Sequence, residues 1–192
     1  LKYEQLRDFV VADPKAMLLC ELRSNALEDL AKQKSLFVEH IQGLNLRYAE
    51  VILDADDADK AFELRKAGLG LLGNMVGDNK AVACIEDTAV ALDDLTNYIK
   101  EFSELMTTYN QEVVYYAHAG AGELHLRPIL NLKSASDVVH FKEITYDVAK
   151  LVKRYRGSMS GEHGDGRLRA EFIEFMVGTP CYNLLREIKQ IF

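Results

Sequence analysis

The chain has 192 residues, enough to bury one sizeable hydrophobic core in one domain or in two closely fused halves. Its composition, 48% hydrophobic and 28% charged, is that of an ordinary soluble globular protein. The net charge of −7 argues against a general nucleic-acid-binding surface, for which a basic face is expected. No run is long or apolar enough for a membrane-spanning helix, and no signal peptide is recognisable.

The cysteines and the first residue of the chain bear on its context. Cys20, Cys84 and Cys181 are scattered, odd in number and set in apolar surroundings, which predicts reduced core thiols in a cytosolic protein and no disulfide framework or Cys-x-x-Cys metal site. The chain begins with Leu1 instead of Met, in a segment that already has a helical pattern. We therefore expect a piece of a longer protein.

The first half of the chain predicts strands that alternate with helices. Apolar residues at 16–22 predict a buried strand, and helical spacing predicts a helix over residues 26–41, which Gly43 ends. A second strand is expected over residues 48–53. Residues 58–72 predict a helix, whose positively polarised amino end suits the acidic residues that precede it.

The second half continues this alternation and favours a layered α+β domain. A parallel dinucleotide-binding sheet fits less well, because no strand leads into a G-x-G-x-x-G turn that opens a helix. We expect a ferredoxin-like, mostly antiparallel sheet with helices packed on one face, as a single copy or duplicated. Strands are predicted over residues 80–85, 113–117 and 124–130, and helices over residues 92–109, 137–155, 167–177 and 182–192.

Two histidines bracket a run of small residues in the segment 118–125, His-Ala-Gly-Ala-Gly-Glu-Leu-His. On one unbroken strand His118 and His125 would point to opposite faces, because side chains alternate and the separation is odd. The glycines between them permit a tight turn or a bulge that can bring both imidazoles to one side. Beyond the turn, Glu123, His125 and Arg127 share one face of the predicted strand.

A second glycine-rich segment, residues 160–166, again carries a histidine beside a carboxylate. Two imidazoles and a carboxylate suit a borderline divalent ion such as zinc. His118, His125 and Glu162 are therefore candidate metal ligands, and three ligands leave positions open for substrate oxygens. His163, the neighbour of Glu162, can stay unligated as a general base.

Other interpretations of these residues compete with a catalytic metal site. A single histidine at a strand end is more often a hydrogen-bonded structural residue. The chain could then be a non-catalytic ferredoxin-like module for oligomerisation or regulation. A free-standing zinc hydrolase is weaker, because no HExxH-type helix is present. Nearby arginines would suit an anionic substrate; these are Arg127, Arg167 and Arg169.

The two glycine-rich motifs together resemble the C-terminal domain of FAD-linked oxidases, a family that includes glycolate oxidase flavoprotein subunits, D-lactate dehydrogenases and D-2-hydroxyglutarate dehydrogenase. The resemblance extends through residues 64–70 and 85–90, so it covers most of the chain. It implies that residues 1–192 form a ferredoxin-like substrate or cap domain of a longer flavoprotein. In that protein a separate N-terminal domain would bind FAD, and the whole would be an FAD-dependent 2-hydroxy-acid dehydrogenase. The isolated chain is expected to be inactive.

The resemblance also implies roles for individual residues. By position, His118 and His125 correspond to the metal-ligand histidines of the family and Glu162 to its ligating glutamate, with zinc or manganese as the expected ion. His163 corresponds to the residue that takes the proton of the substrate hydroxyl. The residues expected to bind substrate are Arg65 and Lys80, by resemblance, and Arg127 and Arg167, by charge.

Two departures from the family pattern concern the pocket. Ala121 and Glu123 stand where many members have Asp and Asn, so the polarity of the substrate pocket should differ.

The expected partners are the FAD-binding domain, a small 2-hydroxy acid, an iron–sulfur segment or subunit, and a second copy of the chain, but no nucleic acid. The expected location is the cytoplasm, either free or peripheral to the inner face of the membrane.

Overall fold

The structure is a computed structural model that describes residues 4–44, 49–53 and 55–192. The chain divides into two compact units, Leu1–Leu71 and Leu72–Phe192. Each unit is described by itself below.

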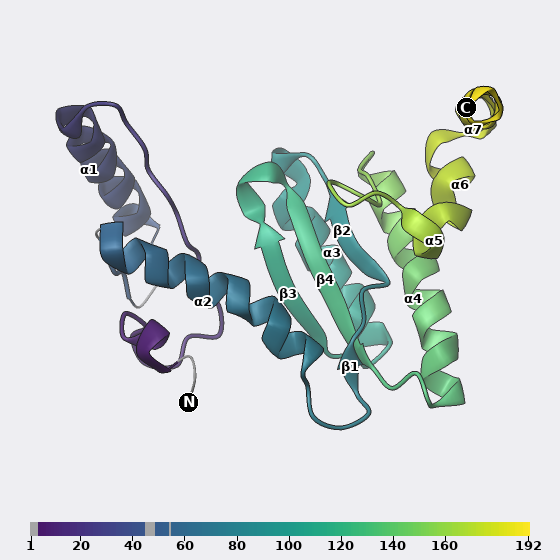
Figure 1. The fold of residues 1–192 in the computed structure, drawn as a ribbon, viewed down its shortest axis with the longest axis horizontal. Helices are drawn as coiled ribbons and strands as arrows, with labels where there is room; N and C mark the ends of the chain where they lie inside the picture. Colours follow the sequence, from purple (N-terminus) through teal and green to yellow (C-terminus); the bar gives the residue numbers. More distant parts are fainter. Residues whose placement is uncertain (1–3, 45–48, 54) are drawn as a thin grey trace. The chain divides into compact units, whose positions relative to one another are not determined.

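The regular secondary structure described in unit 1 is helical. It contains the short 3-10 helix η1 (Glu4–Arg7), α1 (Leu27–Gly43) and most of α2 (Ala55–Gly73), which continues to the start of unit 2 (Figure 1). The helices predicted over residues 26–41 and 58–72 are therefore confirmed. Because α1 has no buried residue, its apolar stripe contributes nothing to a core within this unit.

The strand predicted over residues 16–22 is wrong, and residues 49–53 form no strand either. Residue 48, the first of that second predicted strand, lies outside the described residues. A strand is stable only when a neighbouring strand bonds its backbone groups, and no pairing among the described residues includes either segment. Most of their apolar side chains are exposed, as Leu18 at 79% and Ile52 at 56% illustrate. Cys20 in the first segment and Cys181 near the carboxyl end are exposed as well, so the prediction of core thiols is wrong for these two, and only Cys84 is buried.

Unit 2 contains an antiparallel sheet built around the strand β4 (Glu123–Leu130). β3 (Val113–His118) pairs along one edge of β4, and β2 (Ile85–Ala89) pairs along the other. The short β1 (Lys80–Ala81) pairs with the end of β4. The predicted antiparallel α+β fold is confirmed, although the strand expected over residues 80–85 forms as two separate strands.

Two long helices, α3 (Leu95–Thr108) and α4 (Ala135–Arg154), pack on one face of this sheet, with the short η2 (Leu92–Asp94) before α3 (Figure 1). Alternation along β4 turns Leu124 and Leu126 toward the helices and leaves the polar residues of β4 on the opposite face. No helix in the described ranges is apolar over a length that would cross a membrane. The buried core combines side chains from the sheet and both helices: Ile85, Leu124, Leu126, Tyr98, Phe102, Met106, Ile144, Val148 and Val152.

The helix predicted over residues 167–177 forms as three short pieces, α5 (Gly166–Arg169), η4 (Ala170–Phe172) and α6 (Ile173–Val177). The break coincides with Arg169, whose buried guanidinium donates to the carbonyl oxygens of Glu86, Met159 and Gly164. These tertiary contacts override the local helical pattern. The last helix, α7 (Thr179–Ile191), agrees with the prediction.

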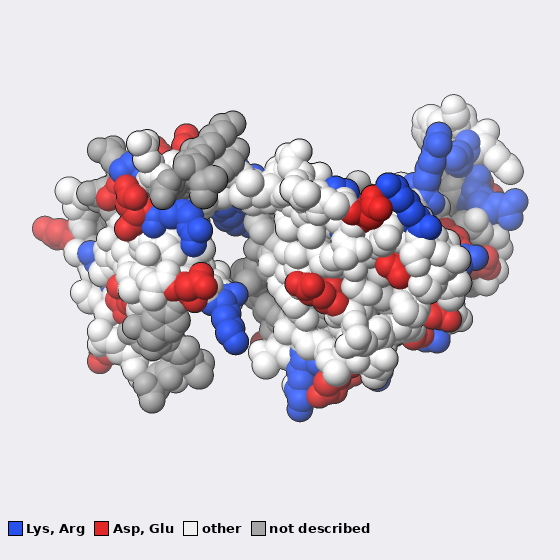
Figure 2. All heavy atoms as spheres, turned by 90° about the horizontal axis from the view of Figure 1, so that it is seen from below, with Lys and Arg blue, Asp and Glu red and all other residues white. Residues whose placement is uncertain are grey.

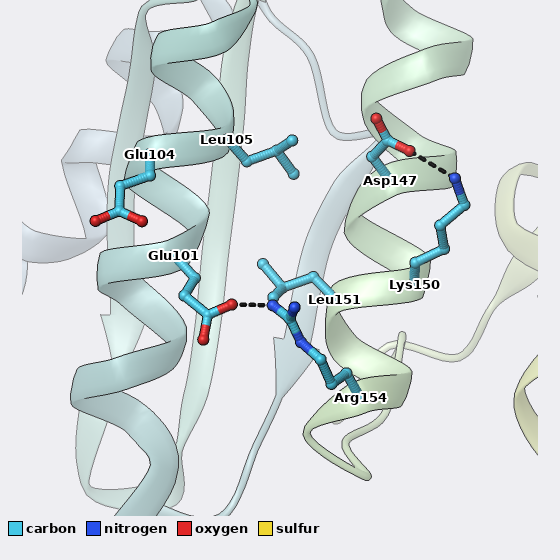
Figure 3. A pocket seen from close by; sticks show the side chains of 7 residues that line it. All are labelled: Glu101, Glu104, Leu105, Asp147, Lys150, Leu151 and Arg154. Atoms are coloured by element: carbon cyan, nitrogen blue, oxygen red, sulfur yellow. Dashed lines mark hydrogen bonds and ion pairs between the residues drawn. The ribbon is translucent and has the colours of Figure 1, made fainter.

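A groove lined mainly by charged side chains lies between the helices α3 and α4 (Figure 3). Its charged groups pair with one another: Arg154 with Glu101, and Lys150 with Asp147 at 2.9 Å. Tyr109 also donates to Asp147 at 2.6 Å. The Arg154–Glu101 and Tyr109–Asp147 contacts join the two helices, and the pairing leaves the groove with little unpaired charge for a ligand.

The hairpin between β3 and β4 is closed by the one-turn helix η3 (Ala119–Ala121) and by Gly122. Gly122 has φ +71°, a left-handed conformation that L side chains rarely adopt. A Cβ atom at this position would lie 2.1 Å from the carbonyl oxygen of Val90. The tight turn therefore requires glycine for two reasons, its backbone conformation and the close approach of another segment.

Asp87 lies at an irregularity in β2, where the register with β4 shifts between Glu86 and Thr88. Its φ of +71° places the carboxylate in the interior, where Asp87 is 0% exposed. The carboxylate accepts hydrogen bonds from the backbone N–H groups of Glu162 and His163, both at 2.8 Å, and from the Ser160 hydroxyl at 2.5 Å. The Asp87 carbonyl accepts a further bond from the Gly161 N–H at 2.7 Å.

One buried carboxylate thus attaches the loop after α4 to the sheet. Burial by itself raises the pKa of Asp87, but hydrogen bonds from Ser160, Glu123 and the backbone of His163 and Glu162 outweigh it. The net pKa of Asp87 lies well below its usual range, so the ionised form is strongly favoured in the folded protein.

Replacing Gly122 by alanine should destabilise the protein by about 2 kcal/mol or more, because the new Cβ meets the Val90 carbonyl in a left-handed residue. Gly120→Ala is the matched control, since a Cβ there meets nothing within 4 Å and Gly120 has no positive φ. It should change the free energy of unfolding by less than about 0.5 kcal/mol. Urea unfolding measures both, and equal stability of the two variants would contradict the packing argument.

Asp87→Asn should lower the free energy of unfolding by about 2–4 kcal/mol, because an amide NH₂ would face N–H or O–H donors in the interior. Ser160→Ala removes only one of these donors and should cost about 1 kcal/mol.

The pH dependence distinguishes a charge effect from a packing effect at Asp87. A carboxyl whose folded pKa is depressed stabilises the fold above its unfolded pKa, and this contribution is lost as the pH falls. The stability difference between wild type and Asp87→Asn should therefore shrink below about pH 4. A difference that stays constant from pH 7 to pH 3 would assign the effect to packing.

Candidate functional site

The β3–β4 hairpin places three side chains that could bind a metal ion on one face of the sheet. His118 lies directly opposite Glu123 in the antiparallel register, and Tyr116 lies opposite His125. Directly opposed residues share a face, and so do residues two apart on one strand. His118, Glu123 and His125 therefore project together from the face that α3 and α4 do not cover. The turn predicted from the glycines does bring both imidazoles to one side.

The loop that Asp87 attaches brings Glu162 and His163 to the same place. Glu162 Oε1 lies 3.7 Å from His118 Nε2 and 3.7 Å from His125 Nε2. It also lies 3.1 Å from His163 Nε2. The ring of His163 stacks on that of His125, with centroids 5.5 Å apart. The predicted cluster of two histidines and a glutamate, with a further histidine beside it, thus exists as a spatial group.

His125 is held between two sets of carboxylates. Its Nδ1 lies 3.5 Å from Glu86 Oε1, while its Nε2 faces Glu162 and also lies 3.6 Å from Glu123 Oε1. Glu86 is itself fixed by Arg127, which donates to it at 2.6 Å. Nδ1 has no hydrogen-bond partner at this distance, so the contact with Glu86 is electrostatic, and Nε2 is the nitrogen that faces the other possible metal ligands.

The protonation state of His125 suits the binding of a metal ion. Burial lowers the pKa of His125, although the nearby Glu86 carboxylate acts in the opposite direction. The neutral imidazole, which is the form that binds a metal ion, is therefore favoured.

Glu123 is the most unusual residue in this part of the structure. Burial raises its pKa to about 7, and the hydrogen bond to Asp87 and the charge of Glu162 add to this effect. Its Oε1 atom is buried and has no hydrogen-bond partner. A carboxylate oxygen buried in this way costs free energy unless some group compensates it.

The imidazole nitrogens and carboxylate oxygens of the cluster lie close enough together to bind one divalent ion. One donor from each of His118, Glu123, His125 and Glu162 lies within 4.8 Å of every other. Two ligand atoms on one tetrahedral zinc ion lie about 3.3 Å apart, because each is about 2.0–2.1 Å from the metal. Three of the separations, those of Glu162 from His118 and His125 and that of Glu123 from His125, are 3.6–3.7 Å and close to that value. The side chains present therefore fit a metal ion of the expected kind.

The residues predicted to bind substrate have different surroundings. Arg127 pairs with Glu86, and Lys80 Nζ donates to the carbonyl oxygen of Met75. Arg167 is exposed on α5. Arg65 lies on α2 in unit 1, apart in the chain from the residues of the hairpin and the loop, which belong to unit 2. Its role stays a prediction.

Sequence reasoning missed the parts of Glu86, Asp87 and Glu123. A signal for the first two was present, because charged residues in a short segment between buried apolar ones require partners. The alternation of side chains along the strand placed Glu123 on the same face as His125, but Glu123 was not considered as a further metal ligand. On the face of the molecule shown in Figure 2, acidic and basic side chains form scattered small groups among residues of other types.

Known proteins are similar to this chain in sequence. The family described as FAD linked oxidases, C-terminal domain, matches residues 4–192. A D-2-hydroxyglutarate dehydrogenase of Haemophilus influenzae is 36% identical over 155 residues, which cover 81% of this chain and 15% of that protein. A D-2-hydroxyglutarate dehydrogenase of Pseudomonas putida is 30% identical over 197 residues, 99% of this chain and 19% of that protein.

A more distant relative, glycolate oxidase subunit GlcD of Bacillus subtilis, is 21% identical over 141 residues, 72% of this chain and 29% of that protein. The chain thus spans less than a third of the length of each of these relatives. Their names are those of oxidoreductases, as the resemblance of the two glycine-rich motifs implied. The match over almost the whole chain shows that it belongs to the C-terminal domain family of the FAD-linked oxidases.

Proposed function

We propose that this chain provides the substrate- and metal-binding part of an FAD-dependent 2-hydroxy-acid dehydrogenase. The single observation that supports this most is the convergence of His118, His125 and Glu162 beside His163, from segments far apart in the sequence. The relatives named D-2-hydroxyglutarate dehydrogenase and glycolate oxidase support a 2-hydroxy acid as the substrate class. Among these acids, D-2-hydroxyglutarate is the first candidate, because those relatives match with higher identity.

In this proposal His118, His125 and Glu162 hold the divalent ion, zinc or manganese. A bound ion of this kind supplies positive charge that orients the hydroxyl and carboxylate oxygens of a substrate and favours loss of the hydroxyl proton. Glu86 lies 3.5 Å from His125 Nδ1, on the side of the ring away from Nε2, which faces Glu162.

His163 takes the proton of the substrate hydroxyl. Its side chain is 52% exposed, so the ring is open to a ligand, while its backbone is fixed by Asp87. The stacking on His125 keeps the imidazole beside the group that would hold the substrate. A general base must lie within reach of the proton that it removes, and only then does its pKa decide how well it acts.

The remaining chemistry belongs to FAD, which another domain of the full-length protein would bind. When bound, FAD would supply the acceptor for a hydride from the substrate α-carbon; His163 would take the hydroxyl proton, so that the product would be a 2-keto acid. Lys80, Arg127, Arg167 and Arg65 are the candidates for binding the substrate carboxylate. An iron–sulfur segment or subunit would then accept the electrons from the reduced flavin.

His163→Ala in the full-length protein should lower kcat with D-2-hydroxyglutarate by about 10²–10⁴-fold, because the base is lost. His118→Ala should lower both activity and bound metal. The matched control is His140→Ala, since His140 lies on α4 against Tyr109, away from the cluster. That variant should keep wild-type turnover.

Dye-reduction kinetics with D-2-hydroxyglutarate, D-lactate and glycolate, together with flavin and metal content, measure these effects. Near-normal turnover of His163→Ala and His118→Ala on all three acids, with flavin fully bound, would end the proposal.

A further inference from the structure

Glu123 has a buried carboxylate oxygen that the protein itself leaves without a hydrogen bond. The side chain is only 8% exposed, and Oε1 has no hydrogen-bond partner. Buried polar atoms in folded proteins almost always have a partner, and an unpaired carboxylate oxygen is among the costliest exceptions. The arrangement therefore calls for a compensating group at this oxygen.

The neighbours of Glu123 do not provide that group. Two of them, Asp87 and Glu162, are acidic and add to the unfavourable charge. Arg127 pairs with Glu86, and Arg169 donates to backbone carbonyls and lies 3.8 Å from Asp87. Among the described residues the one ion-pair neighbour of Glu123 is His125, a largely neutral imidazole.

The side chain is also aimed and confined. Glu123 Oε1 lies 3.6 Å from His125 Nε2, the same nitrogen that faces Glu162. Gly161 packs against the side chain so closely that a Cβ at this glycine would lie 3.2 Å from Glu123 Cγ. The carboxylate thus points toward the group of imidazole nitrogens with little freedom to turn away.

We propose that Glu123 is a fourth protein ligand of the divalent cation, so that this chain binds the ion with two imidazoles and two carboxylates. This inference rests on the proposed function and refines its site. Two carboxylates balance the charge of a divalent ion within the protein, and they reduce the number of positions open to substrate oxygens. The buried unpaired oxygen is then explained as a ligand atom, since a metal ion is the partner that it lacks.

The test measures metal affinity in the full-length flavoprotein with Zn²⁺ and Mn²⁺, by competition with a chromophoric chelator. Glu123→Gln keeps the shape of the side chain but removes its charge, and should weaken binding by at least about 10–100-fold. Glu123→Asp keeps the charge but shortens the reach, and should also weaken binding. Glu104→Gln is the matched control, because Glu104 is exposed on α3, and its affinity should stay within twofold of wild type.

Thermal unfolding of the metal-free and metal-loaded forms separates a ligand from a purely structural residue. Metal-free Glu123→Gln should be at least as stable as metal-free wild type, because the amide removes a charge from a cluster of carboxylates. The increase in Tm on adding Zn²⁺ should be smaller than in wild type. A variant that is destabilised without metal, and shows the full metal-induced increase, would make Glu123 structural.

The outcomes also distinguish this inference from the proposed function. Loss of metal from His118→Ala with wild-type affinity in Glu123→Gln and Glu123→Asp would overturn the fourth ligand and leave the proposed function intact. Wild-type affinity in His118→Ala as well would overturn both. Weakened binding in all three, with Glu104→Gln unchanged, is the result that we expect.

Discussion

The candidate site depends on one buried carboxylate. Asp87 accepts hydrogen bonds from two successive backbone N–H groups and one hydroxyl of a loop that lies 73–76 residues further along the chain. Glycine-rich loops lose much conformational entropy when they are ordered, and several bonds to one ionised group offset that loss. Glu162 and His163 are therefore positioned by their backbone, which leaves their side chains available for chemistry.

The other half of the site is positioned by the sheet. Antiparallel register places His118 opposite Glu123, and the left-handed Gly122 closes the hairpin where the register requires it. β4 is bonded on both edges, so these side chains project from a well-supported strand. A site that joins such a rigid strand to one attached loop can hold several donors at short separations while its outer side stays open.

Charge balance divides the carboxylates of the site into two kinds. Glu86 and Asp87 have arginine partners within the protein, and both act by holding other groups in place. Glu123 and Glu162 have only imidazoles as ion-pair partners among the described residues. Carboxylates that lie close together without a cationic partner destabilise the folded protein. Natural proteins tolerate such destabilisation mainly at functional sites, where a bound ligand can offset it. This imbalance is the physical reason to regard the cluster as a binding site.

Much of the fold could be predicted from sequence because it depends on local pattern. The apolar spacing that predicts α3 and α4 reflects which residues can face a core, and this holds whatever the core contains. The antiparallel α+β arrangement followed from the alternation of elements. The proximity of the two glycine-rich motifs was also predicted, first from the metal-binding chemistry of their residues and then through their resemblance to a family.

Other features depended on partners that no local pattern reveals. Residues 16–22 have the composition of a buried strand, yet they form none, because a strand exists only where another backbone bonds to it. Arg169 was assigned to an anionic substrate, but its guanidinium donates to three backbone carbonyls, one in β2 and two in the loop after α4. The sequence by itself determined which residue types could form a site and on which faces they lie. Only the tertiary structure decided the roles of Asp87 and Glu123, because hydrogen bonding and burial of a side chain are properties of its neighbours in space.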